Sequence, residues 1–259
     1  MPEGLEAEIY RRSALKGVGR TIAAVEIDEF QAEAPDIAGV LPGLVVTGAR
    51  RRGKLVLLDL GQGKDVVVLG LHFGMTGRLI VDGHSAIDEL EYASGRDQPT
   101  WNRLVITFDD GGVMRVNDPR RLARFTLDPD EDRLGPDLLA VSRDELAAAL
   151  GRRRRAIKAV LLDQTVIAGL GNLLVDEVLW RSGIAPARRS DEVSDDEIGV
   201  LHREMTTTLE VLLERGGSHR GVISPEVRSS QPACPRCGGG LTRDQVGGRT
   251  TIWCPRHQI

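Results

Sequence analysis

The spacing of hydrophobic residues along the chain changes near residue 126, from short runs to longer helical periods. Before that point, runs rich in Val, Ile and Leu are separated by glycines and by the hairpin sequence DDGG. These runs predict strands at residues 21–30, 43–61, 65–83 and 102–118. Because helical segments do not interleave with them, they favour antiparallel sheets packed as a sandwich.

Two further segments complete the first half of the chain. Residues 4–18 have helical spacing, and the positions predicted to face inward are Leu5, Ile9, Leu15 and Val18. Residues 82–100 are polar and are predicted to form a surface loop.

The second half of the chain is predicted to be helical. Residues 132–164 and 194–217 have helical periods, and within them Ser142 and Ser194 are each followed three residues later by a glutamate, which is typical of a helix start. Between them, residues 165–186 form a glycine-rich turn that leads into another helix. The last thirty-odd residues have too few apolar side chains to form a core unaided.

These patterns predict an α+β fold of two domains, an N-terminal helix plus antiparallel β-sandwich followed by a helical domain that carries a small C-terminal tail. The expected boundaries are residues 1–126, 127–227 and 228–259. Composition agrees with a folded chain, at 41% hydrophobic and 28% charged residues. No apolar run approaches the roughly 20 residues of a membrane helix, and the start does not resemble a secretory signal. We therefore expect a protein of the cytoplasm or nucleoid, without a membrane partner.

The net charge of −4 argues mildly against nucleic acid, but the charge is unevenly distributed. Residues 215–259 hold seven basic and two acidic side chains, a net charge of +5. Basic residues also cluster at 49–54 (ARRRGK) and 151–158 (GRRRRAIK). Such clusters either hold phosphates or form solvated faces, and composition alone leaves both readings open.

Cysteine spacing predicts a metal site in the tail. Cys234 and Cys237 form a C-x-x-C, and Cys254 and His257 form a C-x-x-H sixteen residues later. Three thiolates and one imidazole on two turns of a hairpin are typical of one structural, tetrahedral Zn²⁺ ion. A redox C-x-x-C would need no matching second pair, and a disulfide scaffold would leave one cysteine unpaired.

Two further positions have the chemistry of phosphate contacts. Arg249 is predicted at the turn end of the zinc hairpin, where it could reach a nucleic-acid backbone. The sequence GLGN at 169–172 allows close backbone approach, and Asn172 adds a donor at the start of a helix. The alternative for GLGN is a tight turn between two helices.

Five motifs in order resemble the formamidopyrimidine-DNA glycosylase/endonuclease VIII family of DNA repair enzymes. They are the MPE start with Glu6, the RRGK ending at Lys54, the NDPRR at 117–121, the GLGN of a helix–two-turn–helix, and the C-terminal zinc finger. The resemblance spans the whole chain. By itself, the MPE start has a simpler reading, in which the proline and the acidic residues only begin a helix. The resemblance gives it a catalytic role instead.

The resemblance implies a catalytic set of Pro2, Glu3, Glu6 and Lys54. Once Met1 is removed, the secondary amine of Pro2 attacks C1′ of the damaged nucleotide and forms a Schiff base, which leads to β,δ-elimination. Glu3 acts as acid and base, and Glu6 supports the amine. Glu8 has no implied role and is expected to be solvated surface.

The resemblance also implies how the enzyme holds DNA. Lys54, Asn172 and Arg249 contact phosphates flanking the lesion, with a weaker contact from Lys158. Met75, Arg120 and Leu122 fill the gap left by the flipped nucleotide, although the third position is usually aromatic. The implied partner is double-stranded DNA containing damaged bases or abasic sites, and a monomer is expected.

Three departures from the family pattern leave the activity open. Gly4-Leu5 replaces Leu-Pro and is expected to loosen the backbone beside Pro2, and His257 replaces the usual fourth cysteine. The segment from Ser218 to Cys234 is shorter than in the formamidopyrimidine branch, so the preferred base is not fixed. The alternatives are an AP lyase without glycosylase activity, a non-catalytic protein that binds damaged DNA, and an unrelated zinc-ribbon transcription or RNA factor.

Overall fold

The structure is a computed structural model that describes residues 2–28, 36–62, 65–87, 90, 95–230 and 233–259. The chain divides into two compact units: unit 1 holds Pro2 and residues 6–131, and unit 2 holds residues 3–5 and 132–259. The structure thus separates two units, and the predicted domain boundaries after residues 126 and 227 stay predictions.

Unit 1 contains two antiparallel sheets, as the strand patterns predict. The first has the order β2-β3-β4-β9 and consists of β2 (Val45–Arg52), β3 (Leu55–Gln62), β4 (Asp65–His72) and β9 (Arg124–Leu127). The second has the order β1-β7-β8-β5-β6 and consists of β1 (Ile22–Ile27), β7 (Asn102–Phe108), β8 (Val113–Asn117), β5 (Arg78–Val81) and β6 (His84–Ser85). The DDGG sequence forms the β7–β8 turn, in which the Phe108 N–H donates to the Gly112 carbonyl.

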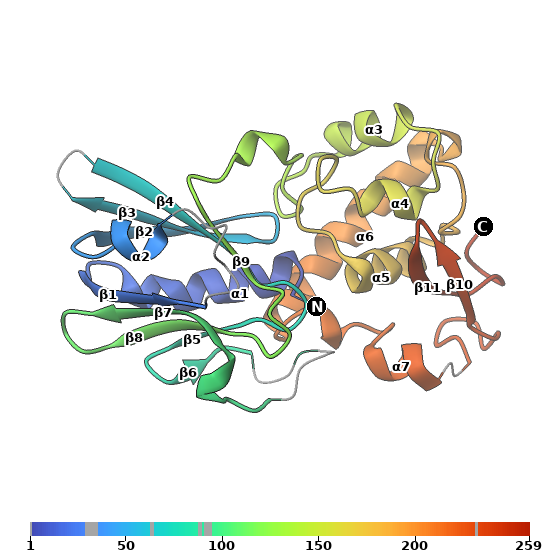
Figure 1. Ribbon diagram of the computed structural model, residues 1–259. Helices are drawn as coiled ribbons and strands as arrows, with labels where there is room; N and C mark the ends of the chain where they lie inside the picture. Colours follow the sequence, from blue (N-terminus) through green and yellow to red (C-terminus); the bar gives the residue numbers. More distant parts are fainter. Residues whose placement is uncertain (1, 29–35, 63–64, 88–89, 91–94, 231–232) are drawn as a thin grey trace. The chain divides into compact units, whose positions relative to one another are not determined.

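Helix α1 (Gly4–Ala14) lies between these two sheets (Figure 1). Its buried positions Ala7, Tyr10 and Ala14 recur every three or four residues and join the core of both sheets. The expected inward positions Leu15 and Val18 are wrong, because their side chains are 44% and 41% exposed. The α-helix ends at Ala14 and a 3₁₀ turn η1 (Leu15–Gly17) changes the period, so the helical spacing no longer points these residues inward.

The expected polar surface loop at 82–100 is only partly correct. It contains the short strand β6, and the described residues Ile87 and Leu90 are buried in the core of unit 1. A 3₁₀ turn η3 (Pro99–Trp101) precedes β7, whereas residues 88–89 and 91–94 lie outside the described residues. A short helix α2 (Ile37–Val40) and a turn η4 (Glu131–Arg133) complete the elements before unit 2.

Unit 2 is helical apart from its C-terminal hairpin. Its α-helices are α3 (Arg143–Gly151), α4 (Ile157–Leu161), α5 (Asn172–Ser182), α6 (Asp195–Glu214) and α7 (Pro225–Ser230). Both predicted helix starts are confirmed, since Ser142 and Ser194 each form a capping box with the glutamate three residues on. The 3₁₀ turns η5 (Ser190–Glu192) and η6 (Ser218–Arg220) connect the helices.

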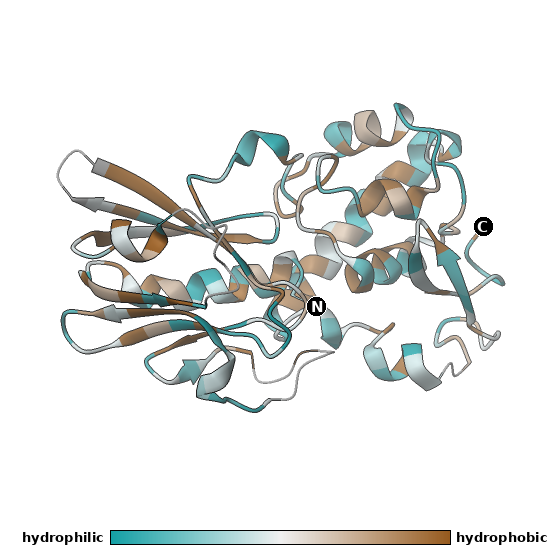
Figure 2. Cartoon of the chain, viewed as in Figure 1, coloured by the Kyte–Doolittle hydropathy of each residue, from teal (hydrophilic) through white to brown (hydrophobic). Residues whose placement is uncertain are grey.

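The tail forms an antiparallel hairpin of β10 (Thr242–Val246) and β11 (Arg249–Trp253). Gly247 and Gly248 both have positive φ, as a two-residue turn of this hand requires. Figure 2 shows mainly hydrophilic colouring on β10, whereas β4 of unit 1 is coloured mainly hydrophobic. The polar character of β10 fits the small apolar core of the hairpin, which lies around Trp180, Leu241 and Ile252. Within the described residues, no helix is both long and apolar enough to cross a bilayer.

Candidate functional site

Glu3 is fixed to the first turn of α5 within unit 2. Its carboxylate oxygens accept hydrogen bonds from the backbone N–H groups of Leu173 (2.9 Å) and Leu174 (3.1 Å), and the side chain is 1% exposed. These two donors are the unpaired groups of a helix start, where an anion is favoured. Gly171 makes room for the carboxylate, since a Cβ at this position would lie 2.2 Å from the Glu3 Cδ atom. The GLGN turn therefore binds a carboxylate of the chain itself.

Gly4 does not loosen the backbone as expected. Its N–H donates to the carbonyl of Gly169 at 2.8 Å, and it begins helix α1. A Cβ at Gly4 would lie 2.7 Å from a methyl group of Leu138 and 3.0 Å from the Gly169 oxygen. The glycine thus allows a close approach of two backbone segments, while Leu5 is buried in the core of unit 2.

The other residues of the predicted catalytic start belong to unit 1. Pro2 is buried in the full-length chain, and Glu6 is 1% exposed. Glu6 lies close enough to Tyr10 to act on its phenol: burial raises the pKa of Tyr10, and the Glu6 charge raises it further. The Tyr10 hydroxyl donates to the Gly77 carbonyl at 3.2 Å, and its ring lies 4.5 Å from that of Phe73. Tyr10 thereby anchors both ends of the turn that carries Met75.

Asp118 links the two turns that carry the predicted gap-filling residues. Its side chain is fully buried and accepts hydrogen bonds from the backbone N–H groups of Arg120, Leu122 and Ala123 and from the Thr76 hydroxyl. Thr76 follows Met75, so a single carboxylate ties the Met75 turn to the NDPRR turn. Arg120 is exposed, whereas Met75 and Leu122 are half-buried.

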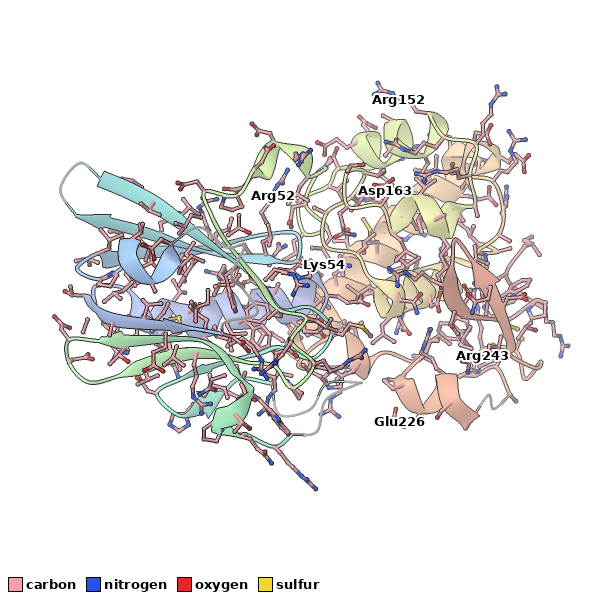
Figure 3. All side chains as sticks on the ribbon, viewed as in Figure 1. Arg52, Lys54, Arg152, Asp163, Glu226 and Arg243 are labelled. Atoms are coloured by element: carbon pink, nitrogen blue, oxygen red, sulfur yellow. The ribbon has the colours of Figure 1, made fainter. Side chains whose placement is uncertain are left out.

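The basic cluster at 49–54 divides between ion pairs and the β2–β3 turn. Arg50 pairs with Asp59 and Glu131, whereas Arg51 lies 3.5 Å from Glu8. Glu8 is therefore not the solvated residue that we expected: it is 8% exposed and also pairs with the two arginines that follow it on α1, Arg11 and Arg12. Burial raises the pKa of Glu8, but these guanidinium groups outweigh it and the net shift is downward. Lys54 lies in the turn after β2, and Figure 3 shows it with Arg52.

His72 is a functional candidate that the sequence analysis missed. It ends β4, and the Gly74 N–H donates to its Nδ1 at 3.2 Å. Burial, followed by the positive charges of Lys54 and Arg124, lowers the pKa of His72. Because Nδ1 accepts the hydrogen bond from Gly74, the neutral form of the ring carries its proton on Nε2. Its position three residues before Met75 was the available signal.

Asn172 is hydrogen-bonded to the residue that follows Arg249 in unit 2. The Asn172 side-chain amide donates to the Thr250 oxygen at 3.0 Å, and Thr250 follows Arg249 on β11. Arg249 is exposed and begins β11 directly after the Gly247-Gly248 turn. The predicted position of Arg249 at the turn end of the hairpin matches the structure.

Lys158 is not placed for the expected phosphate contact. Its side chain is fully buried, and its Nζ donates to Asp176 Oδ1 at 2.6 Å and to the Thr250 carbonyl at 3.1 Å. The ammonium is thus used inside unit 2, because a buried cation requires an anionic partner. In the neighbouring cluster at 151–155, two of the four arginines are paired, Arg154 with Asp191 and Arg155 with Asp163.

Cys234, Cys237, Cys254 and His257 converge as a possible metal site, with ligand atoms all within 4.8 Å of one another. Cys234 Sγ lies 3.6 Å from His257 Nδ1, and Cys237 Sγ lies 3.5 Å from Cys254 Sγ. The Trp180 indole N–H donates to Cys234 Sγ at 3.4 Å, and the Trp180 carbonyl lies 3.1 Å from His257 Nε2, which leaves Nδ1 for a metal. Burial raises the pKa of Cys234, but this indole bond and nearby backbone N–H groups lower it to about 7. The donor set fits a closed tetrahedral ion.

Comparison with known proteins matches both parts of the chain. Residues 1–125 match the formamidopyrimidine-DNA glycosylase N-terminal domain, and residues 134–223 match the formamidopyrimidine-DNA glycosylase H2TH domain. The formamidopyrimidine-DNA glycosylases of Heliobacterium modesticaldum and Paracoccus denitrificans are 33% and 34% identical over 290 and 285 residues, and both alignments cover 100% of each chain.

Solved structures give the same assignment. Wild-type Lactococcus lactis Fpg (MutM) with DNA containing N7-benzyl-Fapy-dG has a TM-score of 0.83 at 26% identity, over 99% of each chain. The same organism's Fpg with DNA containing an abasic site has a TM-score of 0.81 at 25% identity, again over 99% of each chain. With the Glu3-bound helix start and the cysteine cluster, these matches show that the chain belongs to the formamidopyrimidine-DNA glycosylase family.

Proposed function

We propose that this protein is a DNA repair enzyme that excises damaged bases and then cleaves the abasic site by β,δ-elimination. The observation that carries the proposal is the Glu3 carboxylate, bound to the start of α5 one residue after Pro2. Glu3 directly follows Pro2 in the sequence, and a reaction at the Pro2 nitrogen requires a group that can accept and donate a proton. The relatives named above include proteins solved with damaged-base and abasic-site DNA.

The chemistry starts at the Pro2 nitrogen once Met1 is removed. Its lone pair forms a bond to C1′ as the glycosidic bond breaks, and the base leaves with that electron pair. The Pro2 nitrogen, now bonded to C1′, loses its N–H proton to Glu3, and its lone pair then opens the bond between C1′ and the ring oxygen. Glu3 delivers the proton to that oxygen, which leaves an iminium between Pro2 and C1′. Loss of a C2′ proton then expels the 3′ phosphate, and a second elimination expels the 5′ phosphate. Glu6 supports this end of α1 from within unit 1.

DNA binding rests on donors from both units. Lys54 and the Nε2–H of His72 contact phosphate from unit 1, and Asn172 and Arg249 contact phosphate from unit 2. Met75, Arg120 and Leu122 fill the space left by the flipped nucleotide, held by Tyr10 and Asp118. Such contacts position the duplex without reading its sequence.

One structural Zn²⁺ ion is the metal that fits the tail. Cys234, Cys237, Cys254 and His257 would hold it, and its binding energy would stabilise the fold of the β10–β11 hairpin. Four protein ligands would leave the ion no open coordination position, so its role would be structural. The hairpin would contact DNA through Arg249. The protein works as a monomer on double-stranded DNA, and we place it in the cytoplasm at the nucleoid.

The alternative is a protein that retains the lyase step but not base excision. Leu122 favours it, because leucine at the third gap-filling position stacks on a base less well than an aromatic ring. A nicking assay separates the two activities. Duplexes containing 8-oxoguanine, a formamidopyrimidine, an oxidised pyrimidine or an abasic site are incubated with the protein, and the products are resolved by gel electrophoresis. Cleavage at any damaged base supports the proposal, and cleavage of the abasic duplex alone selects the alternative.

A further inference from the structure

Unit 2 contains a buried charged cluster that the mechanism above does not use. It consists of Lys158 on α4, Asp176 on α5 and Arg228 on α7, which are 0%, 1% and 8% exposed. Asp176 Oδ1 accepts from Lys158 Nζ at 2.6 Å. Asp176 Oδ2 accepts from Arg228 Nη1 and, at 3.1 Å, from the backbone N–H of Ile252 on β11. One carboxylate therefore joins three helices to the hairpin.

Three side chains of this region meet at the carbonyl oxygen of Thr250. Lys158 Nζ donates to it at 3.1 Å, Arg228 Nη2 at 3.0 Å and Asn172 Nδ2 at 3.0 Å. Asn172 is one proposed phosphate contact, and Arg249, which precedes Thr250, is the other. The buried cluster thus holds a backbone oxygen that bonds to Asn172 and belongs to the residue after Arg249.

Stability alone is a weak reason for such a cluster. Two cations and one anion lose their hydration when they are buried, and apolar side chains of similar volume often stabilise a core as well or better. Buried charges that meet at one carbonyl do fix a geometry, because each bond has a preferred length and direction. The residues that gain from that geometry are Asn172 and Arg249.

We infer that Asp176 and Arg228 are positioning residues, which set the spacing of Asn172 and Arg249 and thereby the affinity for the DNA backbone. This inference rests on the proposed function, because it assigns phosphate contacts to the latter two residues. Asp176 and Arg228 act through the Thr250 carbonyl and do not themselves contact DNA.

The test is a double-mutant cycle with Arg228→Gln and Arg249→Gln. Arg228→Gln removes the bonds to Asp176 and Thr250 but leaves the neutral pair of Lys158 and Asp176. Binding is measured by fluorescence anisotropy, over a range of salt concentrations, on an uncleavable duplex containing a tetrahydrofuran abasic-site analogue. Melting temperature and bound zinc are measured on every variant. Arg203→Gln, on an exposed position of α6, controls for the loss of one positive charge.

We expect Arg228→Gln to weaken binding about tenfold and to reduce the slope of log K against log salt by about one, as the loss of a direct phosphate contact would. In the Arg249→Gln background the same change should cost less than about twofold, since coupled residues are not additive. Additive effects, an unchanged salt slope, or an equal loss of affinity in Arg203→Gln would overturn the inference. If Arg228→Gln loses zinc, Arg228→Lys replaces it in the cycle and must show the same non-additivity. A wild-type protein that fails to bind the duplex would overturn the proposed function as well.

Discussion

The Glu3 carboxylate accepts a hydrogen bond from the Leu173 backbone N–H at 2.9 Å, across 170 positions of sequence. This bond connects the residue after the proposed nucleophile to the helix whose first residue is the proposed phosphate ligand Asn172. The proposed acid/base group and a proposed DNA contact therefore share one structural support within unit 2. Loss of that support should affect chemistry more than DNA binding.

Gly171→Ala tests this support. The added Cβ would lie 2.2 to 2.5 Å from side-chain atoms of Glu3, so the carboxylate must move from its backbone donors. We expect strand cleavage at an abasic site to slow by at least about tenfold, because misplacement of a catalytic group by about 1 Å can cost a hundredfold. Single-turnover kinetics measures this, with binding to the tetrahydrofuran duplex followed in parallel. Gly151→Ala is the matched control, since a Cβ there meets nothing within 4 Å. Equal rates for both variants would contradict the assigned role of Glu3.

Asp118→Asn should separate base excision from the lyase step. The amide cannot accept from all of Arg120, Leu122, Ala123 and Thr76 as the carboxylate does, and each unpaired buried donor costs about 1–3 kcal/mol. We expect excision of a paired damaged base to fall by at least about tenfold, with much less effect on an abasic site, where no base must be expelled.

The measurement compares excision and abasic-site cleavage on matched duplexes. Asp110→Asn is the control, because Asp110 lies on the exposed β7–β8 turn and caps Gly112. A proportional loss of both activities in Asp118→Asn would mean that Asp118 only stabilises the fold.

His72 should make stability depend on pH below about 6.5, the ordinary histidine pKa. Its pKa is lowered in the folded state by burial and by Lys54 and Arg124, so the unfolded chain binds more protons over this range. The contribution of His72 to stability is therefore fully present above the unfolded pKa and is lost as the pH falls. We expect the free energy of unfolding to decrease from pH 7 to pH 5 by less in His72→Gln than in the wild type. Denaturant unfolding measures the free energy, and NMR titration measures the pKa of the His72 ring. A pKa above about 6.5 in the DNA-free protein would contradict the structure.

Removal of the metal should abolish DNA binding before it unfolds the helices. The hairpin has only a small core around Trp180, whereas α3 to α6 share a large apolar core. Since Trp180 contacts both Cys234 and His257, its fluorescence should change as a chelator removes zinc. Cys234→Ser should reproduce this change. His257→Cys, which replaces the imidazole ligand with a thiolate, should retain zinc and DNA binding. If the metal-free protein bound the duplex as tightly as the zinc-bound protein, the proposed contact of the hairpin with DNA would be contradicted.

Local patterns predicted those parts of the molecule whose partners are near in sequence. The two capping boxes, the DDGG turn and the four metal ligands each lie within a short stretch of chain, and the structure brings each set together as expected. The inward positions of the first helix failed beyond Ala14 because a 3₁₀ turn changed the period.

Long-range relationships were outside the reach of the sequence. The buried state of Lys158 depends on Asp176, Arg228 and the Thr250 carbonyl, which come from three distant segments. The role of Gly171 depends on Glu3 at the other end of the chain. Lys158 and the GLGN turn were both predicted to contact phosphate. In the structure, Lys158 bonds to Asp176 and Thr250, and Gly171 of the GLGN turn makes room for Glu3.

Borohydride trapping on an abasic duplex, followed by peptide mapping, tests the central claim most directly. We predict a covalent adduct on the N-terminal peptide, attached at Pro2 of a chain that has lost Met1, and its absence when an uncleaved tag blocks that end. An adduct on any lysine, or equal trapping by the blocked protein, would contradict the account.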